Sequence, residues 1–332
     1  MEPPFHTSRH IPANAAPRSV AVVVPCYRET ARILDVLARI GPEVARIVVV
    51  DDACPDGTGR WVRERSQDPR VEVLFHDTNQ GVGGAAMTGY RRALEAGADI
   101  IVKLDGDGQM DPELIPVLIE PLLAGETDYA KGNRFRDPDG LSAMPPARLI
   151  GNLVLSFASK VSSGYWDLFD PTNGFTAIHA KVVRALPLAK ISRSFFFESD
   201  MLFRLYLLRA VVTDIPMRAR YGGEQSTLRI TQVIGEFALK HHCNAIKRIL
   251  YTYFLRDFTA ASVELVLGLL LLLFGTGFGL WQWNVSIASG VPATAGTVLL
   301  AALPVILGVQ LLLAFLHFDI GNVPRRPIHP GL

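Results

Sequence analysis

Short apolar runs alternate with amphipathic segments between residues 18 and 110. The run SVAVVVPCY, residues 19–27, has no polar break before its end, which is typical of a strand buried on both faces. The next segment, residues 29–40, spaces its apolar residues at helical intervals. Further strand-like runs cover residues 45–53, 71–77 and 99–108. This rhythm predicts an α/β fold, with a mostly parallel sheet flanked by helices and right-handed crossovers.

The pattern is less regular after residue 110. We expect helices near residues 112–123, 148–162 and 195–210, and strands near residues 128–132 and 211–220. From residue 231 to residue 258 apolar residues recur at helix-like intervals between basic residues and two histidines. This amphipathic helix either lies on an anionic membrane surface or packs against the domain.

The C-terminal part contains no Asp, Glu, Lys or Arg from Leu265 to Phe318. It holds two apolar blocks, residues 262–281 and 297–318, and a membrane helix needs about 20 such residues. Two transmembrane helices are therefore predicted, with a buried soluble hairpin as the alternative. Lys and Arg flank the two blocks but are absent from the loop between them, so we expect the large domain and both termini to be cytoplasmic.

Composition narrows the function. The formal net charge is only +1 over 332 residues, which predicts no nucleic-acid partner. The three cysteines show neither metal-ligand nor redox spacing. Residues 1–17 lack the apolar core of a secretory signal and are expected to be a flexible tail.

Polar residues gather where the predicted strands end. Tyr27 and Glu29 follow the first strand, Asp52 ends the second, and Asp105 and Asp107 end the fourth. Because ligands of parallel α/β sheets bind at the carboxyl ends of the strands, these positions predict a site.

The acidic cluster itself favours a metal. In extended backbone, Asp105, Asp107 and Gln109 share one face, and the glycines between them let a ligand approach. Oxygen ligands of this kind suit Mg²⁺ or Mn²⁺, commonly shared with substrate phosphates. The alternative is a solvated acidic turn, which we prefer for Asp111 and Glu113 at the start of the next helix.

A metal between carboxylates suggests a diphosphate and hence a nucleotide. The glycine-rich segment NQGVGGAAMTG, residues 79–89, matches a dinucleotide-binding loop only loosely and follows the third strand instead of the first. No GxxxxGK[ST] phosphate loop occurs.

Six motifs occur in order across residues 22–175: VVVPCYRE, VVVDDACPDGTG, NQGVGGAAMTG, KLDGDGQMDPE, KGNRF and DPTNGF. Together they resemble family 2 glycosyltransferases of GT-A fold, particularly the polyprenyl-phosphate, dolichol-phosphate mannose synthase-like branch. The resemblance covers roughly residues 18–230.

The resemblance implies roles for individual residues. The nucleotide pocket would be lined by Pro25, Tyr27, Glu29, Asp52 and Asp105, and the metal would be held by Asp105, Asp107 and Gln109.

It also implies Arg134 near the phosphates, Asp170 and Asp200 near the acceptor, and Arg220 against a phosphate. The two aspartates could act as bases or could orient other groups, and we favour orientation. Asp200 itself departs from the pattern, because it stands where the family usually has Glu.

The implied activity is that of a membrane-anchored inverting glycosyltransferase. It would move a sugar from a UDP- or GDP-linked donor to undecaprenyl or dolichyl phosphate on the cytoplasmic leaflet, with Mg²⁺ or Mn²⁺. Membrane lipid is an expected partner, and a homo-oligomer is left open. The alternatives are a family 2 enzyme with another glycan or lipid acceptor, and an inactive nucleotide-sugar-binding membrane protein. A processive synthase is disfavoured because no QxxRW motif occurs.

The expected organisation follows the chain in five parts: a tail (1–17), a GT-A domain (18–230), a juxtamembrane amphipathic segment (231–261), two transmembrane helices (262–322) and a cytoplasmic tail (323–332).

Overall fold

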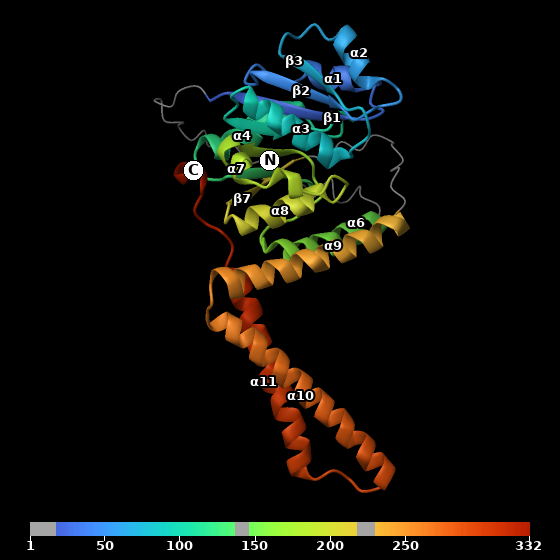
Figure 1. Ribbon diagram of the computed structural model, residues 1–332, viewed down its shortest axis with the longest axis vertical. Coiled ribbons are helices and arrows are strands. Elements are labelled where there is room, and N and C mark those ends of the chain that lie inside the picture. The colour runs from blue at the N-terminus through green and yellow to red at the C-terminus, as the bar shows by residue number, and fades with distance from the viewer. Residues whose placement is uncertain (1–17, 137–145, 218–229) are drawn as a thin grey trace, which may run out of the picture. The chain divides into compact units, whose positions relative to one another are not determined.

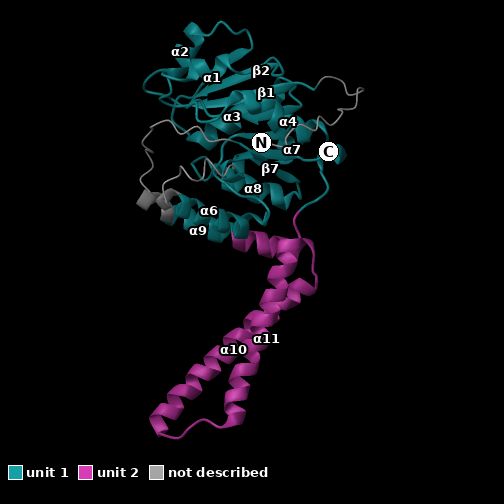
Figure 2. Cartoon of the chain, turned by 180° about the vertical axis from the view of Figure 1, so that it is seen from behind, with its two compact units in different colours: residues 1–244, 324–332 teal, residues 245–323 magenta. Residues whose placement is uncertain are grey.

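The computed structural model describes residues 18–136, 146–217 and 230–332. The chain divides into two compact units (Figure 2). Unit 1 consists of Met1–Asn244 together with Pro324–Leu332, and unit 2 is Ala245–Val323. Unit 2 is thus inserted between two parts of unit 1 along the chain.

Unit 1 is built on a seven-stranded sheet with the order β3-β2-β1-β4-β6-β5-β7 (Figure 1). All neighbouring strands are parallel except β6, which runs antiparallel to β4 and β5. The predicted mostly parallel sheet is therefore confirmed, whereas β6 was not predicted. The strands are β1 (Val20–Cys26), β2 (Arg46–Asp51), β3 (Val71–Phe75), β4 (Ile100–Lys103), β5 (Tyr129–Asn133), β6 (Thr176–His179) and β7 (Val212–Pro216).

Helices flank the sheet, as predicted (Figure 1). They are α1 (Ile33–Ala38), α2 (Thr58–Arg65), α3 (Val82–Glu95), α4 (Ile115–Leu123), α7 (Ala180–Ala185) and α8 (Phe197–Leu207). Helix α6 (Pro146–Ser163) packs on α8, and α9 (Ile230–Leu250) lies beside α6 (Figures 1 and 2).

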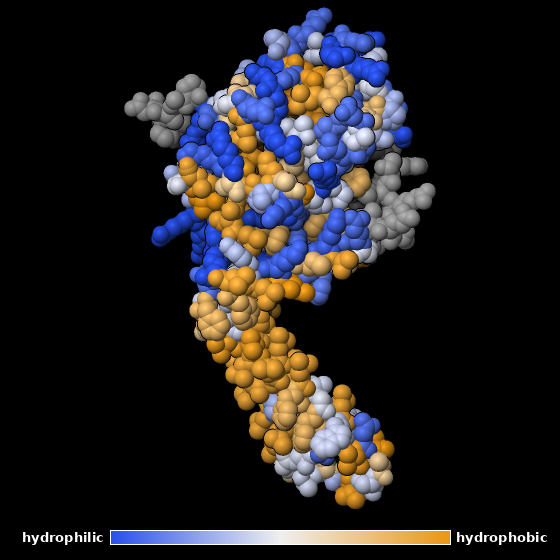
Figure 3. All heavy atoms as spheres, in the orientation of Figure 1, coloured by the Kyte–Doolittle hydropathy of each residue, from blue (hydrophilic) through white to orange (hydrophobic). Residues whose placement is uncertain are grey.

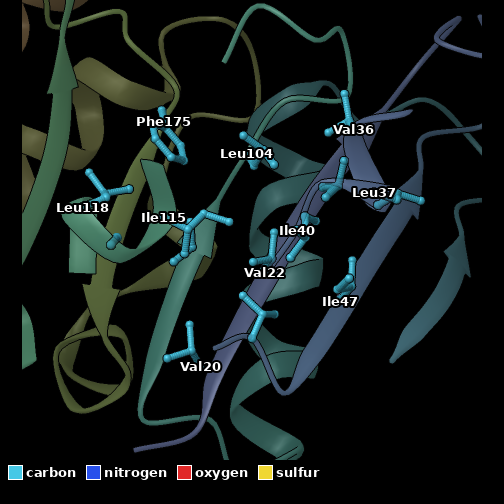
Figure 4. Close-up of a cluster of buried hydrophobic side chains, with 14 of the residues drawn as sticks. Val20, Val22, Val36, Leu37, Ile40, Ile47, Leu104, Ile115, Leu118 and Phe175 are labelled. Atoms are coloured by element: carbon cyan, nitrogen blue, oxygen red, sulfur yellow. The ribbon is translucent and has the colours of Figure 1, made fainter. Parts of the chain in front are cut away.

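A large apolar core lies between the sheet and the helices α1 and α4 (Figure 4). Every residue of β1 is buried, and its Val22 packs in this core with Ile47 of β2 and Ile115 of α4. Burial on both faces explains why these strands have continuous apolar runs without alternation.

The sheet has a switch point between β1 and β4. The chain leaves β1 toward β2 on one side and later places β4 on the other. The ladder to β4 ends near Val23, whose carbonyl accepts a hydrogen bond from the Leu104 N–H at 3.0 Å. Pro25 is the next residue of β1 on that side, where β4 has already ended, so its missing N–H costs no ladder bond. Such a switch point is where ligands bind in open α/β sheets.

The last residues of the chain dock on unit 1, a packing that sequence analysis did not anticipate for the tail. The Asp128 carboxylate, buried just before β5, accepts hydrogen bonds from the main-chain N–H groups of Ile328 and His329, at 2.9 Å for each shortest bond. The His329 ring bonds the same carboxylate through Nδ1 at 2.8 Å. It also stacks on the His179 ring, with centroids 3.9 Å apart. Burial, and then the charge of His329, lower the pKa of His179 to about 4, so His179 is neutral at pH 7.

Asp128→Asn should lower the free energy of unfolding by about 2 kcal/mol, because the buried acceptor loses its charge while its donors remain. Denaturant unfolding of the detergent-purified chain measures this loss. Glu126→Gln, two residues earlier and exposed, is the control and should change stability by less than about 0.5 kcal/mol. Equal stability of the two variants would contradict the docking.

Unit 2 contains α10 (Ala260–Ser289) and α11 (Ala295–Gly321), which are long and apolar enough to cross a membrane. Figure 3 shows hydrophobic residues covering most of the visible surface of this hairpin. The two helices touch through glycine: a Cβ at Gly308 would lie 2.8 Å from the Gly268 carbonyl oxygen. Small residues at such crossings are typical of membrane helix pairs.

A buried ion pair joins the end of α9 to the end of α11 inside unit 2. Arg248 donates to both carboxylate oxygens of Asp319, at 2.6 and 3.0 Å, and the Tyr253 hydroxyl donates to the same group at 2.6 Å. Tyr253 belongs to a π-helical turn, Tyr251–Arg256, that follows α9. The pair holds the C-terminal end of α9 against the C-terminal end of α11.

Candidate active site

Three carboxylates meet at the switch point of the sheet. Glu29 follows β1, and Asp105 and Asp107 follow β4. A Cβ on Gly106 would collide with Glu29 Oε2, so a larger residue at this position would have to displace the Glu29 carboxylate. Burial, and then the charges of Asp105 and Asp107, raise the pKa of Glu29 well above its ordinary value.

The backbone that carries the two aspartates is a turn. Strand β4 ends at Lys103, Gly106 and Asp107 form the turn, and Gly108 has a φ of +77°, which favours glycine. The Asp107 carboxylate accepts a hydrogen bond from the Gln109 N–H at 2.9 Å. The expectation of extended backbone from residue 105 to 109 is therefore wrong, because the glycines reverse the chain. Metal binding by Asp105, Asp107 and Gln109 stays a prediction.

Two basic side chains, Lys103 and Arg32, border these acids. The ammonium of Lys103 is fully buried and donates to Asp105 at 2.7 Å and to Glu198 at 3.4 Å. Three carboxylates, those of Glu29, Asp105 and Glu198, lie near this ammonium, and the Arg32 guanidinium donates to the main-chain carbonyl of Asp107 at 3.1 Å. Oxygen Oε2 of Glu29 is buried and has no hydrogen-bond partner within the part of the chain that the structure describes. A buried, unpaired carboxylate oxygen is costly and invites a cation.

Among the described residues, no group of three or more His, Cys, Asp or Glu could hold a metal by itself. The residues nevertheless fit a cation that arrives with a diphosphate, because Mg²⁺ is usually bound by one or two carboxylates together with substrate phosphates. Such a cation would satisfy the buried Oε2 of Glu29, which has no hydrogen-bond partner among the described residues.

The acids at the end of β2 are occupied by protein donors. The Asp52 carboxylate accepts from the N–H groups of Gln80 and Gly81, at 2.8 and 2.7 Å, and bonds the His76 ring at 2.7 Å. Asp51 accepts from the N–H groups of Cys54, in the loop before α2, and of Gly59, in the first turn of α2. Asp52 therefore shapes the start of α3 in this structure, and its place in the nucleotide pocket stays a prediction.

Tyr27 stands at the same edge with 42% of its surface exposed. The guanidinium of Arg28 lies over its ring, 5.4 Å from the centroid. Arg28 has a φ of +63°, an uncommon conformation for this residue type, which turns the chain sharply after β1. The turn leaves Tyr27 as an accessible aromatic face beside Glu29.

Arg134 and Asp170 are brought together from segments far apart in the chain. Arg134 Nε and Nη2 donate to the two oxygens of Asp170 at 2.7 and 2.6 Å. Burial alone would raise the pKa of Asp170, but the hydrogen bonds and charge of Arg134 offset this and hold it below its ordinary value. Asn173 adds a further bond to Asp170 at 3.2 Å. An ionised carboxylate locked to arginine is a positioning group, and this supports orientation over a role as base.

Asp200, predicted near the acceptor, is held by donors of the protein itself. Asp200 is buried on α8 and accepts from the Ser192 N–H, from Arg204 and from Asn244 of α9, at 2.8 to 3.1 Å. Asp200 thus links α8, the loop that precedes it and α9. Arg220 lies outside the described residues.

Lys103 and Glu198 were missed by sequence reasoning. The available signal was a lysine inside the apolar run DIIVKLD, where an unpaired charge would be costly. Such a lysine needs buried carboxylate partners, but the sequence does not say that α8 supplies one of them.

The fold and the acidic switch point together define a GT-A type glycosyltransferase. The chain matches the model of glycosyl transferase family 2 over residues 21–186, and it belongs to this family.

Three similar proteins illustrate the match. The chain is 36% identical over 203 residues to an undecaprenyl-phosphate mannosyltransferase of Micrococcus luteus, covering 60% of this chain and 82% of the relative. It is 27% identical over 246 residues to a UDP-N-acetylglucosamine–dolichyl-phosphate N-acetylglucosaminyltransferase of Methanococcus voltae, covering 70% and 97%. Glucosyl-3-phosphoglycerate synthase from Mycobacterium tuberculosis, solved with Mn²⁺ and UDP, superposes with a TM-score of 0.50 at 19% identity, covering 70% and 80%. The last likeness shows the fold alone.

Proposed function

We propose that this glycosyltransferase moves a sugar from a nucleoside-diphosphate-sugar to a polyprenyl phosphate, with a divalent metal. The observation that carries the proposal is the carboxylate cluster at the switch point, with its unpaired Glu29 oxygen, in a chain that also has two membrane-length helices. Both relatives with polyprenyl-phosphate acceptors in their names support the acceptor class. They differ in sugar, so the proposal leaves the sugar open.

The proposed role of each residue of the site follows from its charge. When bound, a divalent cation neutralises charge on the leaving nucleoside diphosphate. Asp105 and Asp107 would hold it, and Arg134, oriented by Asp170, would place a guanidinium beside phosphate oxygens. A lipid phosphate is already an anionic nucleophile, so no strong general base is needed. Attack in line with the departing diphosphate inverts the configuration at the sugar carbon.

Several apolar side chains of unit 1 suit a membrane surface. Ile150, Val154 and Phe157 lie three or four residues apart on α6, and each is at least 60% exposed. On α9, Phe237 and His241 pack on Phe196, so this face belongs to the domain. The exposed stripe of α6 favours contact with lipid.

Orientation in the membrane follows from the charges that flank the hairpin. The basic residues before α10 and after α11 support a cytoplasmic location for both ends of the hairpin, and for unit 1 with them. The sugar transfer would then occur at the inner leaflet, where α6 meets the lipid.

Membranes containing the protein should transfer label from one of a panel of radiolabelled UDP- and GDP-sugars into the lipid phase when polyprenyl phosphate and Mn²⁺ or Mg²⁺ are added. Removing the metal with EDTA should abolish the transfer, and adding it back should restore it. Membranes without the protein are the control. Label that enters only a water-soluble glycan would reject the acceptor, and metal-independent transfer would reject the metal.

A further inference from the structure

Lys103 is a buried cation that sits behind the acidic site and is sealed from solvent. It is the last residue of β4, its side chain is fully buried, and its ammonium lies 5.9 Å from the Phe197 ring centroid. A Cβ at Gly174 would approach both the Lys103 ammonium and Asp105 Oδ2, so the DPTNGF segment closes directly over the pair. An ammonium in this position reaches protein carboxylates but not a substrate.

Lys103 has two carboxylate partners of different kinds. Asp105, at 2.7 Å, keeps 26% of its side chain exposed and faces the site. Glu198, at 3.4 Å, is only 12% exposed and comes from the first turn of α8. One partner is therefore available to an incoming cation, and the other is held in the interior.

We propose that Lys103 and Glu198 are positioning residues that set the affinity of the site for its divalent cation, an inference that rests on the proposed function. Without the cation, the ammonium neutralises Asp105. When the cation takes Asp105, Glu198 keeps the ammonium paired, so no charge is left alone in the low-dielectric interior. Asp105 can therefore pair either with the Lys103 ammonium or with the bound divalent cation.

The electrostatics give opposite signs for the two residues. Lys103 repels a divalent cation on Asp105, and Glu198 attracts it, and both act through a medium of low effective dielectric constant. Lys103→Met should therefore tighten cation binding, and Glu198→Gln should weaken it, each by about tenfold or more. A pair that only braced the fold would weaken binding in both variants.

The test measures Mn²⁺ binding to the full-length, detergent-purified chain by electron paramagnetic resonance, with UDP in one series and GDP in another. Thermal unfolding of each variant reports folding separately. The double variant Lys103→Met/Glu198→Gln removes both charges without leaving either unpaired, and it should bind Mn²⁺ more tightly than Glu198→Gln alone. The comparison of the double variant with Glu198→Gln tests the inference even if Lys103→Met alone does not fold.

Weaker Mn²⁺ binding in both single variants, or a double variant no tighter than Glu198→Gln, overturns the inference. Glu198→Asp, which keeps the charge, should retain most of the wild-type affinity, whereas a purely steric role would weaken binding in Glu198→Asp and spare the isosteric Glu198→Gln. If the wild-type chain binds no Mn²⁺ with either nucleotide, the proposed metal-dependent function fails instead.

Discussion

Asp107→Ala should lower the rate of sugar transfer by about 10³-fold while the protein remains folded. The side chain sits on a turn at the edge of unit 1, so its removal opens no core cavity. The substitution removes a carboxylate whose charge, together with that of Asp105, raises the pKa of Glu29. The loss should fall on the step in which charge develops on the leaving diphosphate, because that charge is what the cation held here stabilises.

The measurement is initial-rate transfer by purified protein at saturating metal, with thermal unfolding to confirm the fold. Asp111→Ala is a matched control four residues further on. Its carboxylate pairs with Arg39 and accepts from the Glu113 N–H at 3.2 Å, as expected for the start of a helix. It should cost about 1 kcal/mol of stability and leave transfer nearly unchanged. Near-wild-type activity of Asp107→Ala would refute the metal assignment.

The sheet was predictable where burial is uniform. Strands β1, β2 and β4 lie in the interior, and their unbroken valine and isoleucine runs are the direct result. Strand β6 has only four residues, TAIH, too few to show a period, and its antiparallel pairing depends on contacts that no local pattern encodes. The docking of His329 on Asp128 could not be predicted from the sequence either, because it joins residues 201 positions apart.

The sequence predicts at which strand ends the acidic residues of the site lie. It does not predict the role of each residue. Sequence reasoning placed acids at the ends of β1, β2 and β4, and the topology brings Glu29 and Asp105 together at the switch point. It could not tell that Asp52 is occupied by main-chain donors while an oxygen of Glu29 has none. Partners of that kind come from loops whose geometry is fixed only by the whole fold.

Helix α8 carries two acidic residues whose different roles could not be predicted from the sequence. Glu198 and Asp200 are two residues apart, and residues at that spacing on a helix do not face each other. Glu198 therefore meets Lys103 at the site, while Asp200 turns to Asn244 of α9. The family pattern pointed to position 200, and only the orientation of the helix distinguishes the two.

Asp170→Asn should lower the free energy of unfolding by about 3 kcal/mol at pH 7, and transfer should fall with it. The substitution breaks a buried, two-bond ion pair and leaves Arg134 without its counter-charge. Asparagine is the right replacement because residue 170 has a φ of +55°, a conformation that asparagine tolerates well. Backbone strain is thus excluded as the cause of any loss.

The dependence on pH separates the ion pair from simple packing. Because the pKa of Asp170 is lowered in the folded state, its stabilisation is complete above the unfolded value of about 3.9 and is lost as pH falls through the folded value. The stability gap between wild type and Asp170→Asn should therefore be constant from pH 7 to 5 and shrink below about pH 4. Asp68→Asn, which breaks a surface pair with Arg70, is the control and should cost less than about 1 kcal/mol. Denaturant titrations across this range measure both gaps, and a gap for Asp170 that persists unchanged in acid would show that its charge does not hold Arg134.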